Sequence, residues 1–305
     1  MKTNLKNIVL AVTAGLAVLA APAIAQNAEL VPASVVKDVG AQERINFSGK
    51  LRMLSQRIPS AACHLAEGVE PESSSKLLAS AATEFDKILN ALEFGDEDLS
   101  IIGAEERRKT LKMIHALHDV WDPMKTAADR MAAGDISEED LNFILDQNMA
   151  VLGAAKLLVS ELVAQYSDPV AMVQADSMTI DIAGRQRMLT QKMSKESCML
   201  RSAHAQDDTA QQLQGTMQMF EVSLEALRNG MPDAGIRRPH SPAIAAGLDG
   251  VHAEWSGVKP ALQAILSGME VDDNIEVGKF NALNTTMKKM NEVVGMYTKA
   301  TKHDL

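Results

Sequence analysis

A long internal duplication is the strongest constraint on the fold of this chain. Residues 45–58 and 180–193 align without a gap, and 6 of these 14 positions are identical. Seven further positions are like for like, and only Leu51 against Gln186 changes character. A repeated Gly-x-x-Arg-Met-Leu-Ser/Thr-Gln motif predicts two copies of one domain, with a site to which both copies contribute.

The repeat extends well beyond this motif. The same offset of 135 residues pairs Cys63 with Cys198, and the loss of one residue then pairs Trp121 with Trp255. These are all the cysteines and tryptophans in the chain. So long a period is typical of a tandem domain duplication and not of a short solenoid repeat.

The N-terminal residues resemble a secretory signal. Lys2 and Lys6 precede an apolar stretch over residues 8–21, and a small-x-small cleavage site follows at 23–25. The short apolar run disfavours a membrane anchor, and we expect no later segment with the roughly 20 apolar residues of a membrane span. We therefore predict a signal peptide over residues 1–25 and a mature protein that is periplasmic or secreted and not membrane-inserted.

The charge balance restricts the possible partners. Without Lys2 and Lys6, 28 of the 30 basic residues remain against 40 acidic ones, so the net charge is near −12. This charge disfavours nucleic acid and anionic membrane surfaces as partners. It also makes a local excess of basic residues informative, and both motif regions lack acids, between Glu43 and Glu67 and between Asp181 and Glu196.

Composition and helix breakers predict an all-α protein. The chain is rich in strong helix formers, has 3% aromatic residues and shows no alternating strand pattern. We expect helices at 36–66, 73–92, 104–133, 137–166, 169–204, 208–228, 242–266 and 274–302. Four antiparallel helices with short loops make an up-and-down bundle. The prediction is two tandem four-helix bundles, residues 26–167 and 168–305, with the option of a long helix shared across residue 168.

On a helix, each motif copy places small and polar residues on one face with an arginine in its middle. The first face holds Ser48, Gly49, Arg52, Ser55, Gln56, Pro59 and Cys63. The second holds Ala183, Gly184, Arg187, Thr190, Gln191, Ser194 and Cys198. Small residues permit a close approach of helices, so we expect the two faces to pack together about a pseudo-twofold axis.

That packing would bring Arg52 and Arg187 together. Two buried guanidinium groups repel each other unless an anion lies between them, and each offers a planar fork of donors suited to an oxyanion. We predict a small-anion site formed by these arginines with Gly49, Gly184, Ser55, Thr190, Gln56 and Gln191. Five further basic residues would add to the positive field while pointing away from the face: Lys50, Arg57, Arg185, Lys192 and Lys195. The alternative is that the arginines bond backbone carbonyls or neighbouring acids.

Both motif copies resemble the P-box of bacterial periplasmic sensor domains. That family includes the NarX-type nitrate/nitrite sensor kinases and the PilJ-type N-terminal domain of chemotaxis transducers. The resemblance rests on residues 46–57 and 181–192 and covers both repeats. It implies a four-helix bundle, and in the nitrate sensors the motif arginines of two subunits hold the ligand between their P-box helices. By motif position these arginines are Arg52 and Arg187, which implies a dimer-like arrangement within one chain.

Three features depart from the family pattern. We expect no membrane span, histidine kinase or methyl-accepting region, so signalling across a membrane would need a receptor or transporter partner. Asp181 stands where the family has asparagine and adds a negative charge near the second motif. Pro59 is expected to kink the first helix one turn after Gln56, so the site need not be symmetric.

Other residues suggest weaker hypotheses. If the two motif helices are parallel, Cys63 and Cys198 can form a disulfide in an oxidising compartment; the alternative is two separate buried thiols. A set at helical spacing, His115, His118, Asp119 and Asp122, is a metal hypothesis. The second copy offers only His252 and Glu254 there, so we prefer a solvated face and predict no metal. The 18 methionines could suggest a soft-metal site, but they fall mostly at helical core spacing, which favours a role in core packing.

We expect a binding protein and not an enzyme. The chain has no nucleophile–base set, phosphate loop or haem-attachment motif, and no cofactor is predicted. The main hypothesis is a periplasmic sensor of a small oxyanion, nitrate or nitrite by the family resemblance. The alternative is a helical interaction module that binds a chemotaxis or pilus receptor through the small-residue faces, without a small ligand.

Overall fold

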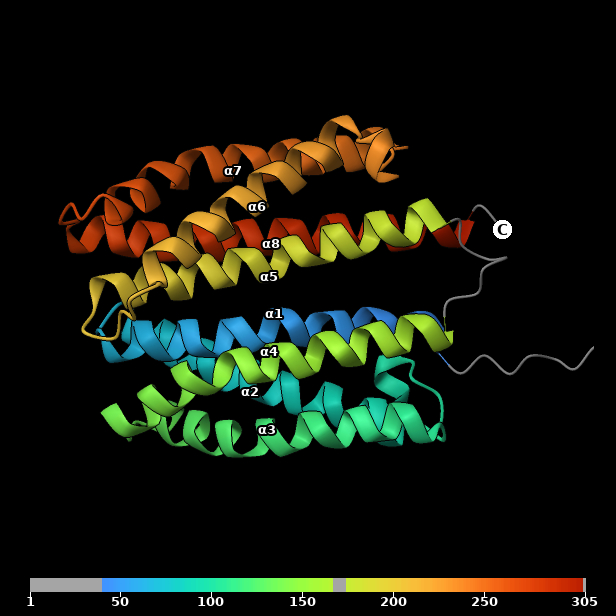
Figure 1. Ribbon diagram of the computed structural model, residues 1–305, viewed down its shortest axis with the longest axis horizontal. Helices are drawn as coiled ribbons and strands as arrows, with labels where there is room; N and C mark the ends of the chain where they lie inside the picture. The colour runs from blue at the N-terminus through green and yellow to red at the C-terminus, as the bar shows by residue number, and fades with distance from the viewer. Residues whose placement is uncertain (1–39, 167–173, 304–305) are drawn as a thin grey trace, which may run out of the picture. The chain divides into compact units, whose positions relative to one another are not determined.

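The computed structural model describes residues 40–166 and 174–303, and these ranges form two four-helix bundles (Figure 1). The first bundle contains α1 (Ala41–Ala66), α2 (Pro71–Phe94), α3 (Arg108–Ala132) and α4 (Glu138–Tyr166). The second contains α5 (Gln174–Arg201), α6 (Thr209–Asn229), α7 (Pro242–Leu266) and α8 (Asp273–His303). The predicted all-α class and the duplicated bundle are confirmed. The expected signal peptide and the expected helix across residue 168 lie outside the described residues.

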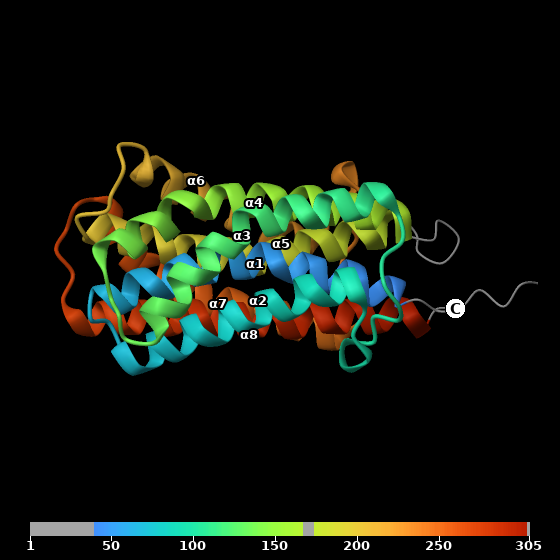
Figure 2. The same ribbon diagram turned by 90° about the horizontal axis from the view of Figure 1, so that it is seen from below.

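Local sequence signals explain most helix starts. Ser137 caps α4, because its hydroxyl oxygen accepts a hydrogen bond from Asp140 N at 3.1 Å. Ser241 caps α7 in the same way through Ile244 N, and prolines occupy the first turns of α2 and α7. Within each bundle the helices lie nearly along one direction (Figure 2).

Each bundle core is built around the paired tryptophans. The Trp121 ring stacks on Phe85 with centroids 4.0 Å apart, and Trp255 packs on Phe220 at 4.9 Å. Each indole N–H donates to a carboxylate on the preceding helix, Asp86 of α2 in the first copy and Glu221 of α6 in the second. The ring and carboxylate partners of the two tryptophans occupy equivalent positions in the repeat, so the duplication preserves the packing of the core as well as its sequence.

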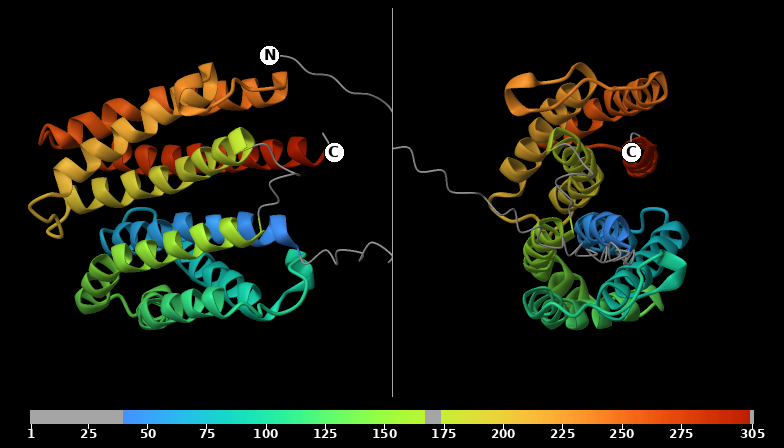
Figure 3. Two further views of the ribbon diagram at one scale, coloured as in Figure 1. Left: turned by 45° about the vertical axis from the view of Figure 1, so that its right-hand side comes forward. Right: turned by 90° about the vertical axis from the view of Figure 1, so that its right-hand side faces the viewer.

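The two bundles meet along α1 and α5, which lie side by side in Figure 1 and in the end view of Figure 3. Ser60 Oγ donates to Ser194 Oγ at 2.8 Å, and Cys63 is joined to Cys198 by a disulfide. Contacts between residues 134 or 135 positions apart, repeated along the helices, require α1 and α5 to be parallel and in register. The small-residue faces therefore pack against each other.

The α1 helix continues through Pro59 to Ala66. Proline lacks an N–H, so the carbonyl of Ser55, four residues earlier, loses its usual helical donor. The side-chain amide of Gln56 replaces it, donating from Nε2 to Ser55 O at 3.1 Å. Gln56 therefore repairs a backbone defect that the sequence analysis treated only as a kink.

One helix of the described part, α4, is long and apolar enough to cross a membrane by length and composition. The sequence analysis expected no such segment. Its apolar side chains line the first bundle, where Leu141, Ile144 and Leu152 are at most 1% exposed. A core helix of a soluble bundle satisfies the same length test, so α4 gives only weak support for a membrane span.

Candidate functional site

The two motif arginines converge between α1 and α5. A Cβ placed on Gly49 would lie 3.7 Å from Nη2 of Arg52 and 3.8 Å from Nη2 of Arg187. A Cβ on Gly184 would lie 3.6 and 3.5 Å from the same two atoms. The two Nη2 atoms are therefore no further apart than the sum of the Gly184 distances, about 7 Å. Both guanidinium groups thus face one gap that exists because the glycines lack side chains.

Both arginines are removed from solvent but only partly bonded. Arg52 is 7% exposed and Arg187 is 3% exposed. In each, the Nε atom is buried without a hydrogen-bond partner among the described residues. Buried polar groups are normally bonded, and an exception in a native fold calls for an unseen water, ion or ligand. Two such atoms, one from each copy, are found at this site.

The remaining bonds of the arginines differ between the copies. Arg52 Nη2 lies 2.8 Å from Asp181 Oδ1, an ion pair that crosses from α1 to α5. Arg187 Nη1 donates to Asn291 Oδ1 of α8 at 2.7 Å, within its own bundle. Arg52 therefore has the carboxylate partner that the sequence left as an alternative to an anion. Among the described residues, Arg187 has a neutral hydrogen-bond partner, Asn291. The site is asymmetric.

The electrostatics agree with crowded positive charge. Burial, and then repulsion from Arg52, lowers the pKa of Arg187 to about 10, against attraction by Glu84. Lys156 on α4 also has a lowered pKa, through burial and then the charges of Lys192, Arg52 and Arg185. An anion placed between the arginines would relieve the repulsion that these shifts record.

The hydroxyl groups of Ser55 and Thr190, both predicted to line the anion site, form hydrogen bonds within their own helices. The hydroxyl of Ser55 donates to Arg52 O and that of Thr190 donates to Arg187 O, both at 2.8 Å. Each hydroxyl hydrogen is used by its own helix, three residues back, and is not directed at the gap. The role of Ser55 and Thr190 as ligand donors therefore stays a prediction, and the arginines and glycines border the gap.

The glutamines bind the neighbouring helices instead. Gln56 Nε2 reaches Asn148 Oδ1 of α4 at 3.2 Å, and Gln191 Nε2 reaches Asn284 Oδ1 of α8 at 3.3 Å. These matching bonds hold each P-box helix to the last helix of its own bundle. The two glutamines thus support the P-box helices in this structure, and their role as direct anion donors stays a prediction.

Two basic residues expected to point away lie instead at the interface. Lys195 is 2% exposed, and its Nζ donates across the bundles to Asn148 Oδ1 at 2.9 Å. Arg57 Nε donates to Gln191 Oε1 at 3.3 Å. Burial lowers the pKa of Lys195 to about 8 and that of Arg57 to about 10. Helical angles placed these residues off the face, but their long side chains bend back to it.

The other predicted basic residues bind acids on the flanks. Lys50 pairs with Glu84, Lys192 pairs with Glu196, and Arg185 pairs with Asp181. Sequence reasoning missed Glu84, Lys156 and Asn291 as neighbours of the site. They come from α2, α4 and α8, and no signal in the motif indicates which residue of another helix lies opposite it.

A buried ionic cluster lies one turn beyond the disulfide. Glu276 of α8 receives Lys279 Nζ at 2.6 Å and lies 3.3 Å from His64 Nε2 of α1 and 2.9 Å from Arg201 Nη1 of α5. Burial would raise the pKa of Glu276, but His64 and Lys279 outweigh it and lower the value to about 2. Burial lowers the pKa of both His64 and Lys279, the latter to about 8. The cluster ties α1 of one bundle to α5 and α8 of the other.

The residues weighed as a metal hypothesis form pairs with neighbouring acids. His115 Nε2 lies 2.9 Å from Glu93, and His118 Nδ1 lies 3.2 Å from Asp122. In the described ranges no three His, Cys, Asp or Glu side chains come together as a metal site would require. These pairs belong to a solvated face of α3.

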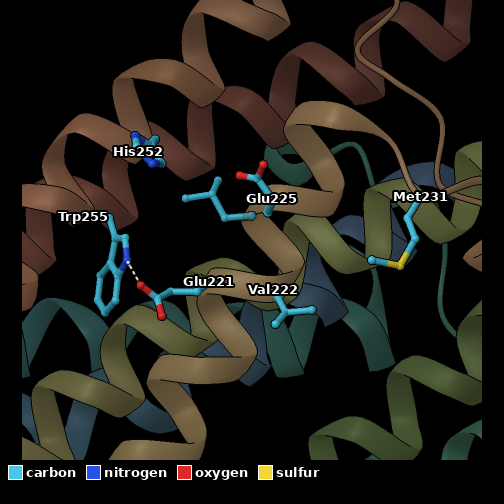
Figure 4. Close-up of a pocket in the computed structure, with 7 residues that line it drawn as sticks. Glu221, Val222, Glu225, Met231, His252 and Trp255 are labelled. Atoms are coloured by element: carbon cyan, nitrogen blue, oxygen red, sulfur yellow. Dashed lines mark hydrogen bonds between the residues drawn. The ribbon is translucent and has the colours of Figure 1, made fainter.

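A surface hollow of about 390 Å³ lies between α6 and α7 (Figure 4). It is lined by Val222, Glu225, Met231, His252 and Trp255, among others, and Glu221 at its wall accepts the Trp255 indole N–H. None of its lining residues belongs to the arginine pair. It is an open apolar depression and adds no donor set for an anion.

The described chain is thus a tandem pair of four-helix bundles with a buried arginine pair at their junction, and comparison with known proteins identifies its family. The chain belongs to the PilJ family, described as the type IV pili methyl-accepting chemotaxis transducer N-terminal domain. The family profile matches residues 37–142 and 170–276, one match per bundle. The family resemblance of the motif is confirmed, and this family is a class of sensing domain in chemotaxis transducers.

One relative is the methyl-accepting chemotaxis protein McpN of Pseudomonas aeruginosa. It is 33% identical over 117 residues, which cover 36% of this chain and 22% of the relative. The match thus spans about a fifth of the relative's length, so the activity of the whole receptor does not transfer to this chain by similarity.

Proposed function

We propose that this protein is a periplasmic sensor of a small oxyanion, with nitrate or nitrite as the expected ligand. The observation that carries the proposal is the pair Arg52 and Arg187, buried and converging on Gly49 and Gly184 with unpartnered Nε atoms. A planar univalent oxyanion matches such a fork of donors in shape and charge. The family membership supports a sensing role.

Anion binding would act on the junction of the bundles. A ligand favours one conformation only if it binds that conformation more tightly than the other. Here the binding groups lie where α1 meets α5, so the ligand should favour the conformation in which these helices are in contact. Neutralising Arg52 and Arg187 strengthens the α1–α5 contact without needing a second chain. A membrane receptor or transporter that contacts both bundles would then distinguish the bound from the free state.

Calorimetry with nitrate and nitrite tests this function. We expect one site per chain, with binding weakened at least about a hundredfold in Arg187→Ala, because a charged hydrogen-bond donor is lost from a buried site. Arg52→Ala should weaken binding as well. Arg228→Ala is the matched control, since Arg228 lies on α6 and pairs with Asp249 far from the motif. Unchanged binding by the Arg52→Ala/Arg187→Ala double variant would reject this site.

Substituting the glycines should separate binding from folding. In Gly49→Ala the new methyl group meets the Nη2 atoms at ordinary contact distances, so the fold is kept. Alanine is favoured over glycine in a helix by up to about 1 kcal/mol, so thermal stability should be equal or higher. The methyl group fills the gap that an anion needs, so binding should be lost. Gly153→Ala on α4 is the control, because nothing lies within 4 Å of its Cβ position and it should keep binding.

One observation favours the alternative of a protein-interaction module. Arg52 already has a carboxylate partner and Arg187 an amide partner, so the pair persists without a small ligand. That function predicts no thermal shift with any oxyanion and capture of a chemotaxis or pilus receptor by the intact chain. A thermal-shift screen of oxyanions distinguishes the two.

A further inference from the structure

A carboxylate is built into the arginine site. Asp181 Oδ1 lies 2.8 Å from Arg52 Nη2, the same nitrogen that faces the gap between Gly49 and Gly184. Its second oxygen, Oδ2, accepts two hydrogen bonds from Arg185, from Nε at 2.9 Å and Nη2 at 2.6 Å. Asp181 is therefore held in place on α5 with one oxygen directed at the other bundle.

The position equivalent to Asp181 in the first copy is Asn46, which carries no charge. Of the two arginines, Arg52 forms a direct ion pair with a carboxylate, that of Asp181. Arg187 has the neutral Asn291 instead. Glu84 pairs with Lys50 and attracts Arg187 only through its charge. The duplication has produced a symmetric pair of cations with an asymmetric counter-charge.

We propose that Asp181 is a specificity-determining residue, a resident counter-ion that makes the arginine pair select univalent over divalent oxyanions. This inference rests on the proposed function of the pair. Asp181 repels every anion that enters the site and so lowers its binding affinity. The repulsion energy is proportional to the charge of the anion. If Asp181 reduces the affinity for a univalent anion by some factor, it reduces that for a divalent anion by about the square of the factor.

The carboxylate stays charged at the pH of a cell envelope. Burial would raise the pKa of Asp181, but the charges of Arg52 and Arg185, with their hydrogen bonds, outweigh it and lower the value. Arg185 is more than half exposed, so water screens its charge more than that of the buried Arg52. An anion that enters the gap beside Arg52 is therefore repelled by the carboxylate of Asp181, because the charge of Arg185 is screened by water.

The test compares Asp181→Asn with the unaltered chain, using anions matched in shape. Perchlorate and sulfate are both tetrahedral but carry one and two charges, and nitrate serves as the planar univalent probe. We expect Asp181→Asn to bind nitrate and perchlorate about tenfold more tightly and sulfate about a hundredfold more tightly. Asp249→Asn is the control, because it removes the same charge from an exposed ion pair on α7. Circular dichroism and the melting temperature verify that each variant is folded.

The outcomes separate this inference from the proposed function. If the unaltered chain binds nitrate and Asp181→Asn binds all three anions with unchanged affinity, the role of Asp181 is rejected and the sensing function stands. An equal gain for perchlorate and sulfate also rejects it, because loosening of the site would act equally on both. Binding by Asp181→Asn alone would reject both the sensing function of the unaltered chain and the selectivity role, because Asp181 would then exclude univalent and divalent anions alike. If neither protein binds any anion, the proposed function fails and this inference fails with it.

Discussion

Removing the disulfide should lower the free energy of unfolding by about 4 kcal/mol. Cys63 and Cys198 are 135 residues apart, so the bond restricts a very long loop of the unfolded chain. In the chain-entropy description the stabilisation rises with loop length, which places this bond near the upper end of the usual range. The bond also joins the two bundles at their junction, so its loss should make them unfold less cooperatively.

The double variant Cys63→Ala/Cys198→Ala is the suitable test. Both sulfur-bearing side chains are at most 1% exposed, and serine would bury a hydroxyl group where alanine leaves none. Urea unfolding followed by circular dichroism should show a clearly lower midpoint than in the oxidised protein. A reducing agent should lower the midpoint of the unaltered chain and leave that of the variant unchanged. Equal midpoints for the oxidised protein and the variant would show that α1–α5 packing alone holds the bundles.

Glu276→Gln should destabilise the protein by about 3–5 kcal/mol, the usual cost of removing one partner from a buried ion pair. Glu276 is 2% exposed and is the acid shared by His64, Lys279 and Arg201. Without that charge, the buried Lys279 has neutral acceptors in its place, Ser197 Oγ at 2.8 Å and the amide oxygen of the new glutamine. Glu72→Gln is the matched control, because the Glu72–Lys76 pair is exposed and should change stability by less than about 1 kcal/mol.

The pH dependence of unfolding distinguishes this cluster from a simple packing defect. Glu276 has its folded pKa at about 2, below the ordinary 4.5, so the stability that it contributes is complete above 4.5 and is lost as the pH falls towards 2. His64 also has a lowered folded pKa, so the unfolded chain binds its proton first and stability starts to fall below about 6.5. Glu276→Gln should reduce the loss of stability between pH 4.5 and 2, leaving the part contributed by other carboxyl groups with a lowered pKa, such as Asp181. If the melting temperatures of the variant and of the unaltered chain fall by the same amount between pH 4.5 and 2, Glu276 is not the titrating group.

Much of the architecture could be predicted because it depends on local and repeated signals. Gly134 and Pro242, for example, mark the end of one helix and the start of another, and the structure has α3 ending at Ala132 and α7 starting at Pro242. The convergence of Arg52 and Arg187 followed from one physical argument, that two equal faces of small residues pack closely. The motif could not reveal that Ser55 and Thr190 donate to their own helices, since a buried hydroxyl chooses the nearest acceptor.

The sequence by itself determined the duplication, the helical bundles and which residues share a face with each arginine, because helical periodicity is a property of the chain alone. Only the tertiary structure decided what lies opposite that face. The Arg52–Asp181 pair, the Asn291 partner of Arg187 and the reach of Lys195 to Asn148 all join separate helices. Such contacts depend on the register between helices and on the bending of long side chains, which are set by packing of the whole molecule.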